Sequence, residues 1–229
     1  ALAACVWLRL CWPGAPRSSI LVAFLLILAS WPAVWGYFQR QPSLFVLAAM
    51  ALAVFWFQKR QDVPSAIFLA AAAVKPQMVM LLIPWLLLVA VVDRRWRFVT
   101  SFAAALALLL AASAWLVPHW IPHWIHASLA YARYPAKISL LAFLFGRPAG
   151  LILMLALLAI LVLRLRALRS IAADPRALLQ SVALVLAVSV GCMPANPWLV
   201  FNDLLLVPGI LLLLAASETP PLAAALRTL

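Results

Sequence analysis

Lys75 is the residue whose position most strongly indicates chemistry. It lies in Ser65–Val92, an apolar stretch that is interrupted by Lys75–Pro76–Gln77. An ammonium group at the centre of a bilayer costs about 2.5–3.5 kcal/mol on insertion scales, so it needs a partner, a cavity or an interface. In one interpretation, Lys75 binds the phosphate of an anionic lipid and Gln77 donates hydrogen bonds to the same ligand. In the other, Lys75 extends from a helix end to the headgroups, and the sequence leaves both open.

A second group of polar side chains lies in Pro118–Lys137. Its candidate residues are His119, His123, His126, Tyr131, Arg133 and Tyr134. The three histidines would share one face of a single helix, but Pro122 interrupts that helix, and no carboxylate follows closely to orient the rings. We therefore expect no metal site. The segment is typical of an aromatic-rich helix at the membrane interface, and His126, Arg133 and Tyr134 remain candidates to face a substrate phosphate.

Two further polar positions could contact a ligand. Asn196 and Asn202–Asp203 lie late in the chain, where they could bind sugar hydroxyls or simply cap a helix whose dipole favours an anion. Arg40 and Gln41 precede Pro42, where the arginine could pair with a phosphate or be an ordinary loop charge.

The composition indicates the environment in which these residues act. Hydrophobic residues make up 69% of the 229 residues and charged residues only 10%, whereas soluble domains are close to half apolar and a quarter charged. A soluble chain of this size could not bury that much apolar surface. We therefore expect an integral membrane protein.

Apolar runs between polar segments predict an all-α, polytopic transmembrane bundle with short, broken or re-entrant helices, in a single domain over residues 1–229. Several runs are shorter than the ~20 residues of a perpendicular span, and short helices at membrane depth indicate an internal cavity. The predicted helices are 1–12, as the tail of a cut helix, and 18–35, 42–57, two halves of 65–92, 98–117, 150–163, 177–193 and 204–216.

The basic residues predict the topology. They cluster at Lys59–Arg60, Asp93–Arg97 and Arg164–Arg176, as in the cytoplasmic loops of membrane proteins. This pattern accounts for the net charge of +12. The charge therefore does not indicate a nucleic-acid-binding protein, and the sequence shows no basic face with polar residues that could contact bases. All three clusters are cytoplasmic only if Ser65–Val92 forms a hairpin that turns at Lys75–Pro76. A single kinked span is the alternative.

Four short motifs resemble segments of glycosyltransferase family 87. The resemblance rests on Ala70–Leu88 (AAAAVKPQMVMLLIPWLLL), Arg40–Gln41–Pro42–Ser43, Pro118–Tyr134 and Asn196–Pro208. It implies a GT-C-class enzyme that moves a hexose, often mannose, from a polyprenyl-phosphate donor to a lipid or glycan acceptor, without a cofactor. The implied partners are the lipid-linked sugar and membrane lipids, and the implied location is the bacterial inner membrane.

The resemblance also implies a catalytic aspartate in the first extracytoplasmic loop, for which this sequence has no counterpart. Asp62, Asp93 and Asp174 fall in predicted cytoplasmic loops, and Asp203 is late in the chain. We expect the chain to be a fragment that lacks the N-terminal helices and that loop, and to transfer no sugar alone. A transporter or flippase of lipid-linked substrates is the alternative. Such a protein would also need a basic site for the phosphate, but it would not need the catalytic aspartate.

Overall fold

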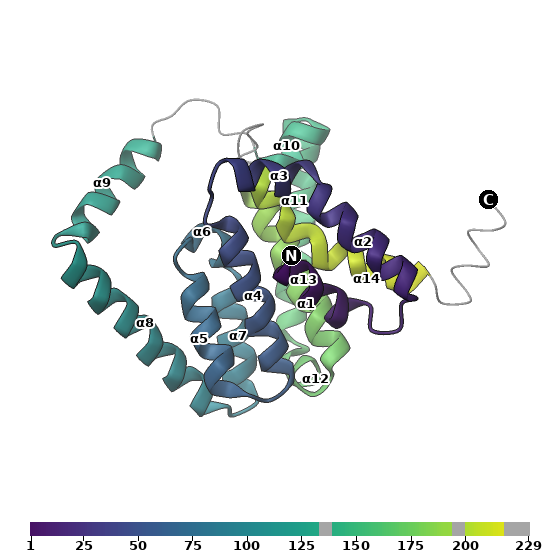
Figure 1. Ribbon diagram of the computed structural model, residues 1–229, viewed down its shortest axis with the longest axis horizontal. Coiled ribbons are helices and arrows are strands. Elements are labelled where there is room, and N and C mark those ends of the chain that lie inside the picture. The colour runs from purple at the N-terminus through teal and green to yellow at the C-terminus, as the bar shows by residue number, and fades with distance from the viewer. Residues whose placement is uncertain (133–138, 194–199, 218–229) are drawn as a thin grey trace.

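The computed structural model describes residues 1–132, 139–193 and 200–217, and every regular element in this part of the chain is a helix (Figure 1). In chain order these are α1 (Leu2–Cys11), α2 (Arg17–Ala29), α3 (Trp31–Phe38), α4 (Ser43–Gln58), α5 (Asp62–Ala72), α6 (Pro76–Val79), α7 (Leu82–Val92), α8 (Trp96–Leu116), α9 (Trp120–Ala132), α10 (Leu140–Phe145), α11 (Arg147–Leu165), α12 (Leu168–Ala173), α13 (Pro175–Cys192), the 3₁₀ helix η1 (Val200–Leu206) and α14 (Val207–Ser217). The predicted all-α class is confirmed.

The centre of the bundle consists of α4, α5 and α7, with α1 and α13 against them (Figure 1). These helices carry small residues between large apolar ones, which lets their backbones approach closely. Met50 of α4, Leu69 of α5 and Leu86 of α7 are fully buried, as are Trp7 of α1 and Leu186 of α13. This core fixes the short helices that hold Lys75.

Three described helices are long and apolar enough to cross a membrane: α8, α11 and α13. Most of the α8 and α11 surfaces is exposed, including Leu108 at 72% and Ile152 at 67%. Helices so apolar on all sides face lipid rather than water. The chain is therefore a membrane protein, and the shorter apolar helices of its centre are held between flanking spans.

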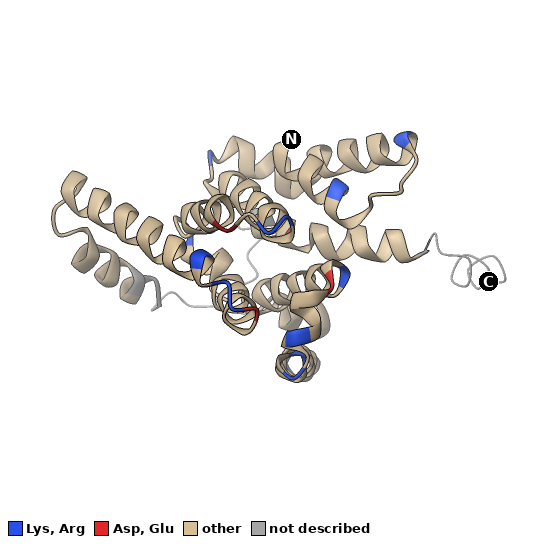
Figure 2. Ribbon diagram, turned by 90° about the horizontal axis from the view of Figure 1, so that it is seen from below, with Lys and Arg blue, Asp and Glu red and all other residues tan. Residues whose placement is uncertain are grey.

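The segment 65–92 forms the predicted hairpin. Helices α5 and α7 run in opposite directions, and two ion pairs join their far ends: Arg60 with Asp93 at 2.5 Å, and Arg95 with Asp62. At the same end, the Gln58 side-chain amide donates to the carbonyl oxygen of Pro175 at 3.1 Å. The basic segments therefore gather at one end of the bundle, where Figure 2 shows acidic positions beside basic ones. This arrangement excludes the single kinked span.

The prediction of one continuous helix over 18–35 was wrong, because the helix breaks at Ser30. Helices α2 and α3 meet at an angle of 47°. Ser30 is extended, and its hydroxyl donates to the carbonyl oxygen of Ile27 at 2.7 Å. Pro32 has no N–H to continue the helical ladder, so the chain starts a new helix at Trp31.

The α10–α11 hairpin depends on Gly150, where a Cβ atom would lie 2.4 Å from the Cα and N atoms of Ala142. We expect Gly150→Ala to destabilise the protein by about 1–3 kcal/mol, because backbone must move to accept the methyl group. The matched control is Gly14→Ala, since no atom lies within 4 Å of a Cβ at Gly14. Thermal unfolding in detergent measures both, and equal melting temperatures would show that the close approach is not needed.

Candidate functional site

Lys75 lies at the turn of the hairpin. Helix α5 ends at Ala72, and α6 begins at Pro76. Proline is favourable at the first position of a helix, because the N–H group of that position has no partner within the helix. The residue before a proline avoids helical geometry, and Lys75 has φ −123° and ψ 80°. Because α5 has 11 residues, the turn lies about 16 Å from the ion-paired end. This is roughly half the thickness of the hydrocarbon core.

The ammonium group of Lys75 joins three segments that are distant in sequence. Its Nζ donates to the hydroxyl oxygen of Ser43 at 2.5 Å and to Oδ1 of Asn202 at 3.2 Å. Ser43 is the first residue of α4, and Asn202 belongs to η1. Lys75 and Asn202 are each 8% exposed, and Ser43 is fully buried. We call Ser43, Lys75 and Asn202 the ammonium cluster.

The ammonium cluster differs from the other buried polar groups of the described chain. Ser65, Ser181 and Ser189 each donate to a backbone carbonyl oxygen, as serines in membrane helices commonly do. Arg95 donates to the Asp62 carboxylate at 2.8 Å. In contrast, the ammonium cluster joins a lysine to a hydroxyl and an amide from two distant segments, and both of these groups are neutral. A buried ionisable group of this kind marks a functional site in membrane proteins by default.

Arg40 and Gln41 lie immediately before the cluster in sequence. Arg40 has a left-handed φ of 49°, and the Gln41 N–H donates back to the Gly36 carbonyl oxygen at 3.0 Å. This is the hydrogen-bond pattern of a Schellman C-cap, here without the usual glycine. The turn sharply ends α3 and opens a cavity of about 450 Å³, lined by Gly36, Tyr37, Phe38, Arg40, Gln41 and Leu44. An arginine and an amide therefore face a space that begins one residue from Ser43.

The structure does not bring the remaining predicted residues into the cluster. Gln77 follows Lys75 closely in α6, but its side chain is exposed. Asp203 is half-buried beside Asn202, in the first turn of η1 rather than at the cap of a longer helix. His126 is exposed on α9, which Figure 1 shows together with α8 at the left edge of the bundle, apart from α6. Arg133, Tyr134 and Asn196 lie outside the described residues.

Helix α9 forms in spite of Pro122. The proline is the third residue of the helix, within the first turn, where a missing N–H breaks no hydrogen bond. His119 lies before the helix, with a φ of 63°. It therefore does not continue the helical face of His123 and His126. Helix α9 begins where the α8 span ends, which fits the predicted interfacial position.

Ser43 is the functional candidate that the sequence interpretation missed. A serine after a proline at a helix start resembles a capping residue, but no side-chain cap is formed at this end of α4. The only local signal is its place directly after Arg40–Gln41–Pro42. Its contact with Lys75 spans 32 residues, and helical periodicity carries no information at that distance.

The arrangement supplies a buried cationic hydrogen-bond donor and a buried amide, with an exposed arginine at the adjacent cavity. These groups suit a phosphate, whose oxygens accept charge-assisted hydrogen bonds from Lys and Arg. The described residues offer no group of three or more His, Cys, Asp or Glu side chains that could hold a metal ion.

Comparison with known proteins gives a match to a family model but none to an individual protein. No curated protein and no solved structure matches the chain. The family model of glycosyltransferase family 87 matches residues 1–194. The matched part contains Arg40, Ser43 and Lys75, whereas Asn202 follows it. Since the match covers most of the sequence, this membrane protein belongs to glycosyltransferase family 87.

Proposed function

We propose that the chain is the donor-binding part of a GT-C-type membrane glycosyltransferase that moves a hexose, mannose, from a polyprenyl phosphate to a lipid or glycan acceptor. The membrane is the bacterial inner membrane, with the basic end of the bundle in the cytoplasm. The observation that carries the proposal is the ammonium cluster, in which a buried lysine at the turn of the hairpin donates to a serine hydroxyl and an asparagine amide oxygen. Membership of the family supplies the reaction type, and the cluster supplies the phosphate-binding group.

The geometry supports a division of roles. Lys75 is the phosphate-binding cation, and Arg40 at the adjacent cavity is a second donor to the same group. Asn202 accepts from Lys75 through Oδ1, so its amide nitrogen keeps two N–H groups that can donate to a phosphate oxygen or a sugar hydroxyl. Ser43 also accepts from the ammonium group and helps to position it.

In the proposed reaction, a hydroxyl oxygen of the acceptor attacks the anomeric carbon of the sugar. The bond from that carbon to the phosphate oxygen breaks, and polyprenyl phosphate leaves with the electron pair. The hydroxyl proton passes to a carboxylate base. Lys75 and Arg40 stabilise the phosphate as negative charge develops on it. No residue of this chain is assigned as the base.

The test separates a transferase from a flippase. The full-length gene product, rather than the 229-residue chain alone, is reconstituted in proteoliposomes with radiolabelled polyprenyl-phosphate mannose and a mixed lipid acceptor fraction. A transferase yields labelled acceptor and releases polyprenyl phosphate in equal amounts. Movement of intact donor between leaflets, with no new labelled product, would contradict the proposal and favour the flippase.

A further inference from the structure

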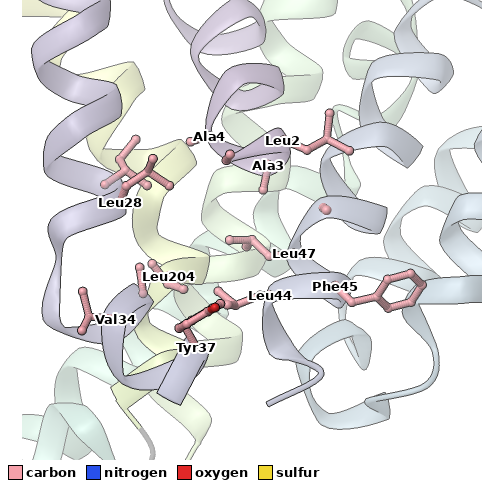
Figure 3. A pocket seen from close by; sticks show the side chains of 14 residues that line it. Leu2, Ala3, Ala4, Leu28, Val34, Tyr37, Leu44, Phe45, Leu47 and Leu204 are labelled. Carbon is pink, nitrogen blue, oxygen red and sulfur yellow. The ribbon is translucent and has the colours of Figure 1, made fainter. Parts of the chain in front are cut away.

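Two cavities of the bundle differ in the side chains that line them. The cavity between α1, α2, α3, α4 and η1, of about 520 Å³, has an apolar lining, with the Tyr37 hydroxyl as its one side-chain oxygen (Figure 3). A second cavity, of about 390 Å³, lies between the end of α1, the start of α13 and the end of α14. Its lining includes the cationic side chain of Arg176 and the amide of Gln180. We call this second cavity the α1–α13–α14 pocket.

The α1–α13–α14 pocket lies at the basic end of the bundle. Arg176 is the second residue of α13, and the carbonyl oxygen of Pro175 beside it accepts from Gln58 at the ion-paired end of the hairpin. The 18 residues of α13 extend about 27 Å, so a span of this length begins close to a membrane surface. Trp12 also lines the pocket, and tryptophan is enriched at the membrane interface. A ligand in this pocket would therefore lie at the depth of the lipid headgroups.

The Arg176 guanidinium group is available to such a ligand. Arg176 is exposed, and among the described residues its side chain forms no hydrogen bond or ion pair, unlike those of Arg60 and Arg95. Asp174 has the nearest carboxylate in sequence, but its Oδ1 accepts from the backbone N–H of Arg176 at 2.9 Å. Asp174 is not one of the lining residues. The positive charge at the pocket is therefore not neutralised by an ion pair.

The other lining residues complete an amphipathic site. Gln180 follows Arg176 by four residues on α13, so the two side chains share one face of the helix. The guanidinium group has a planar fork of N–H donors that matches phosphate oxygens, and the amide can both donate and accept. Leu179, Leu212 and Ala215 form an apolar wall. The volume is at the lower end of the ~300–1,000 Å³ of ligand pockets, which suits a headgroup rather than a whole phospholipid.

We propose that the α1–α13–α14 pocket binds the headgroup phosphate of an anionic phospholipid in the leaflet at the basic end of the bundle. Basic pockets between membrane helices bind anionic headgroups on the cytoplasmic side, which is the side proposed for this end. The site is separate from the donor site. It shares no lining residue with the Arg40 cavity, and it lies at the end of the hairpin opposite to the turn of Lys75.

The experiment uses phosphatidylglycerol with a spin label on its acyl chain, in phosphatidylcholine nanodiscs that hold the 229-residue chain. The immobilised fraction of the label, measured by EPR, gives the affinity. We expect Arg176→Gln to lower this affinity about tenfold, the typical effect of losing a hydrogen bond to a charged group. Gly14→Leu should lower it without a change of charge, because Gly14 lines the pocket and has open space at its Cβ position. Melting temperatures confirm that each variant is folded.

The matched control is Arg169→Gln, which removes the same charge from an exposed position of α12 outside the pocket. In about 1 M salt, exposed charges are screened beyond ~3 Å, so this control should keep the wild-type affinity. Equal losses in Arg169→Gln and Arg176→Gln would show only a general attraction to basic residues and would overturn the site. Unchanged affinity in Gly14→Leu would place the headgroup outside the pocket.

Two further results would contradict the proposal. Displacement of the labelled lipid by an equal concentration of inorganic phosphate would show a site for the free anion rather than for a lipid. A loss of affinity in Lys75→Met as large as that in Arg176→Gln would place the phosphatidylglycerol at the ammonium cluster. We expect Lys75→Met to bind phosphatidylglycerol fully, so this proposal and the proposed function can fail separately.

Discussion

Replacing Lys75 with Met is expected to lower the affinity for polyprenyl phosphate by about 10- to 100-fold. A hydrogen bond to a charged group contributes about 1.5–3 kcal/mol, and this ammonium is the buried cation that we assign to the phosphate. Methionine has a similar length and no charge, so it fills the same space without donating. Binding to the 229-residue chain in nanodiscs measures the effect and requires no catalytic turnover.

The same variant should not lose stability, and this separates a binding role from a structural one. Loss of the lysine leaves the oxygens of Ser43 and Asn202 without this donor, which costs about 1–3 kcal/mol for each oxygen. It also removes a buried ammonium, and an ammonium in the centre of a bilayer costs about 2.5–3.5 kcal/mol. The two terms are of similar size and opposite sign, so the melting temperature should stay close to the wild-type value.

Lys59→Met is the matched control, because Lys59 is exposed at the basic end of the bundle. It should change neither affinity nor stability. Full affinity in Lys75→Met would remove the lysine from the binding site. A large drop in melting temperature with retained affinity would show that the ammonium cluster only joins α4, α6 and η1.

Replacing Arg95 with Met is expected to destabilise the protein by about 3 kcal/mol, the typical cost of removing one partner from a buried ion pair. Arg95 is 8% exposed and donates to both Asp62 and the carbonyl oxygen of Phe57 at 3.0 Å. Its guanidinium also lies 3.9 Å from the centre of the Phe57 ring. The variant leaves the Asp62 carboxylate without this donor at the base of the hairpin, whereas the Phe57 carbonyl oxygen still accepts from the Arg60 N–H at 3.1 Å.

Arg60→Met provides the comparison, because the Arg60 side chain is 58% exposed in its pair with Asp93. Exposed ion pairs contribute about 0–1 kcal/mol, so this variant should unfold close to the wild-type temperature. Thermal unfolding in detergent measures both variants. Equal shifts for Arg95→Met and Arg60→Met would contradict the distinction between the buried and exposed pairs.

The helices of the hairpin could be predicted from the sequence because the signals are local. Pro76 stops a helix, and the basic clusters require both ends of Ser65–Val92 to lie on one side. The break at Ser30 was not predicted. The apolar run continues through it, and a proline at position 32 is equally compatible with the first turn of a helix and with a kink.

The candidate site could be predicted only in part. The apolar surroundings of Lys75 identify it as unusual, but its contact with Asn202 spans 127 residues, and many packings of the helices satisfy the same hydrophobic pattern. His126 shows the opposite case, since its polar type suggested a ligand contact that the exposed position on α9 does not support. Composition therefore indicates which groups are costly in a membrane, and packing decides which of them meet.

The most direct test of the central claim is the distance between the Lys75 nitrogen and the phosphorus of the bound lipid. Solid-state NMR can measure it with ¹⁵Nζ-labelled lysine in a Lys59→Arg, Lys137→Arg background, where Lys75 is the remaining lysine. A direct charge-assisted hydrogen bond predicts ³¹P–¹⁵N dephasing that corresponds to about 4 Å. Saturating lipid phosphate with no dephasing at Lys75 would show that the phosphate binds elsewhere.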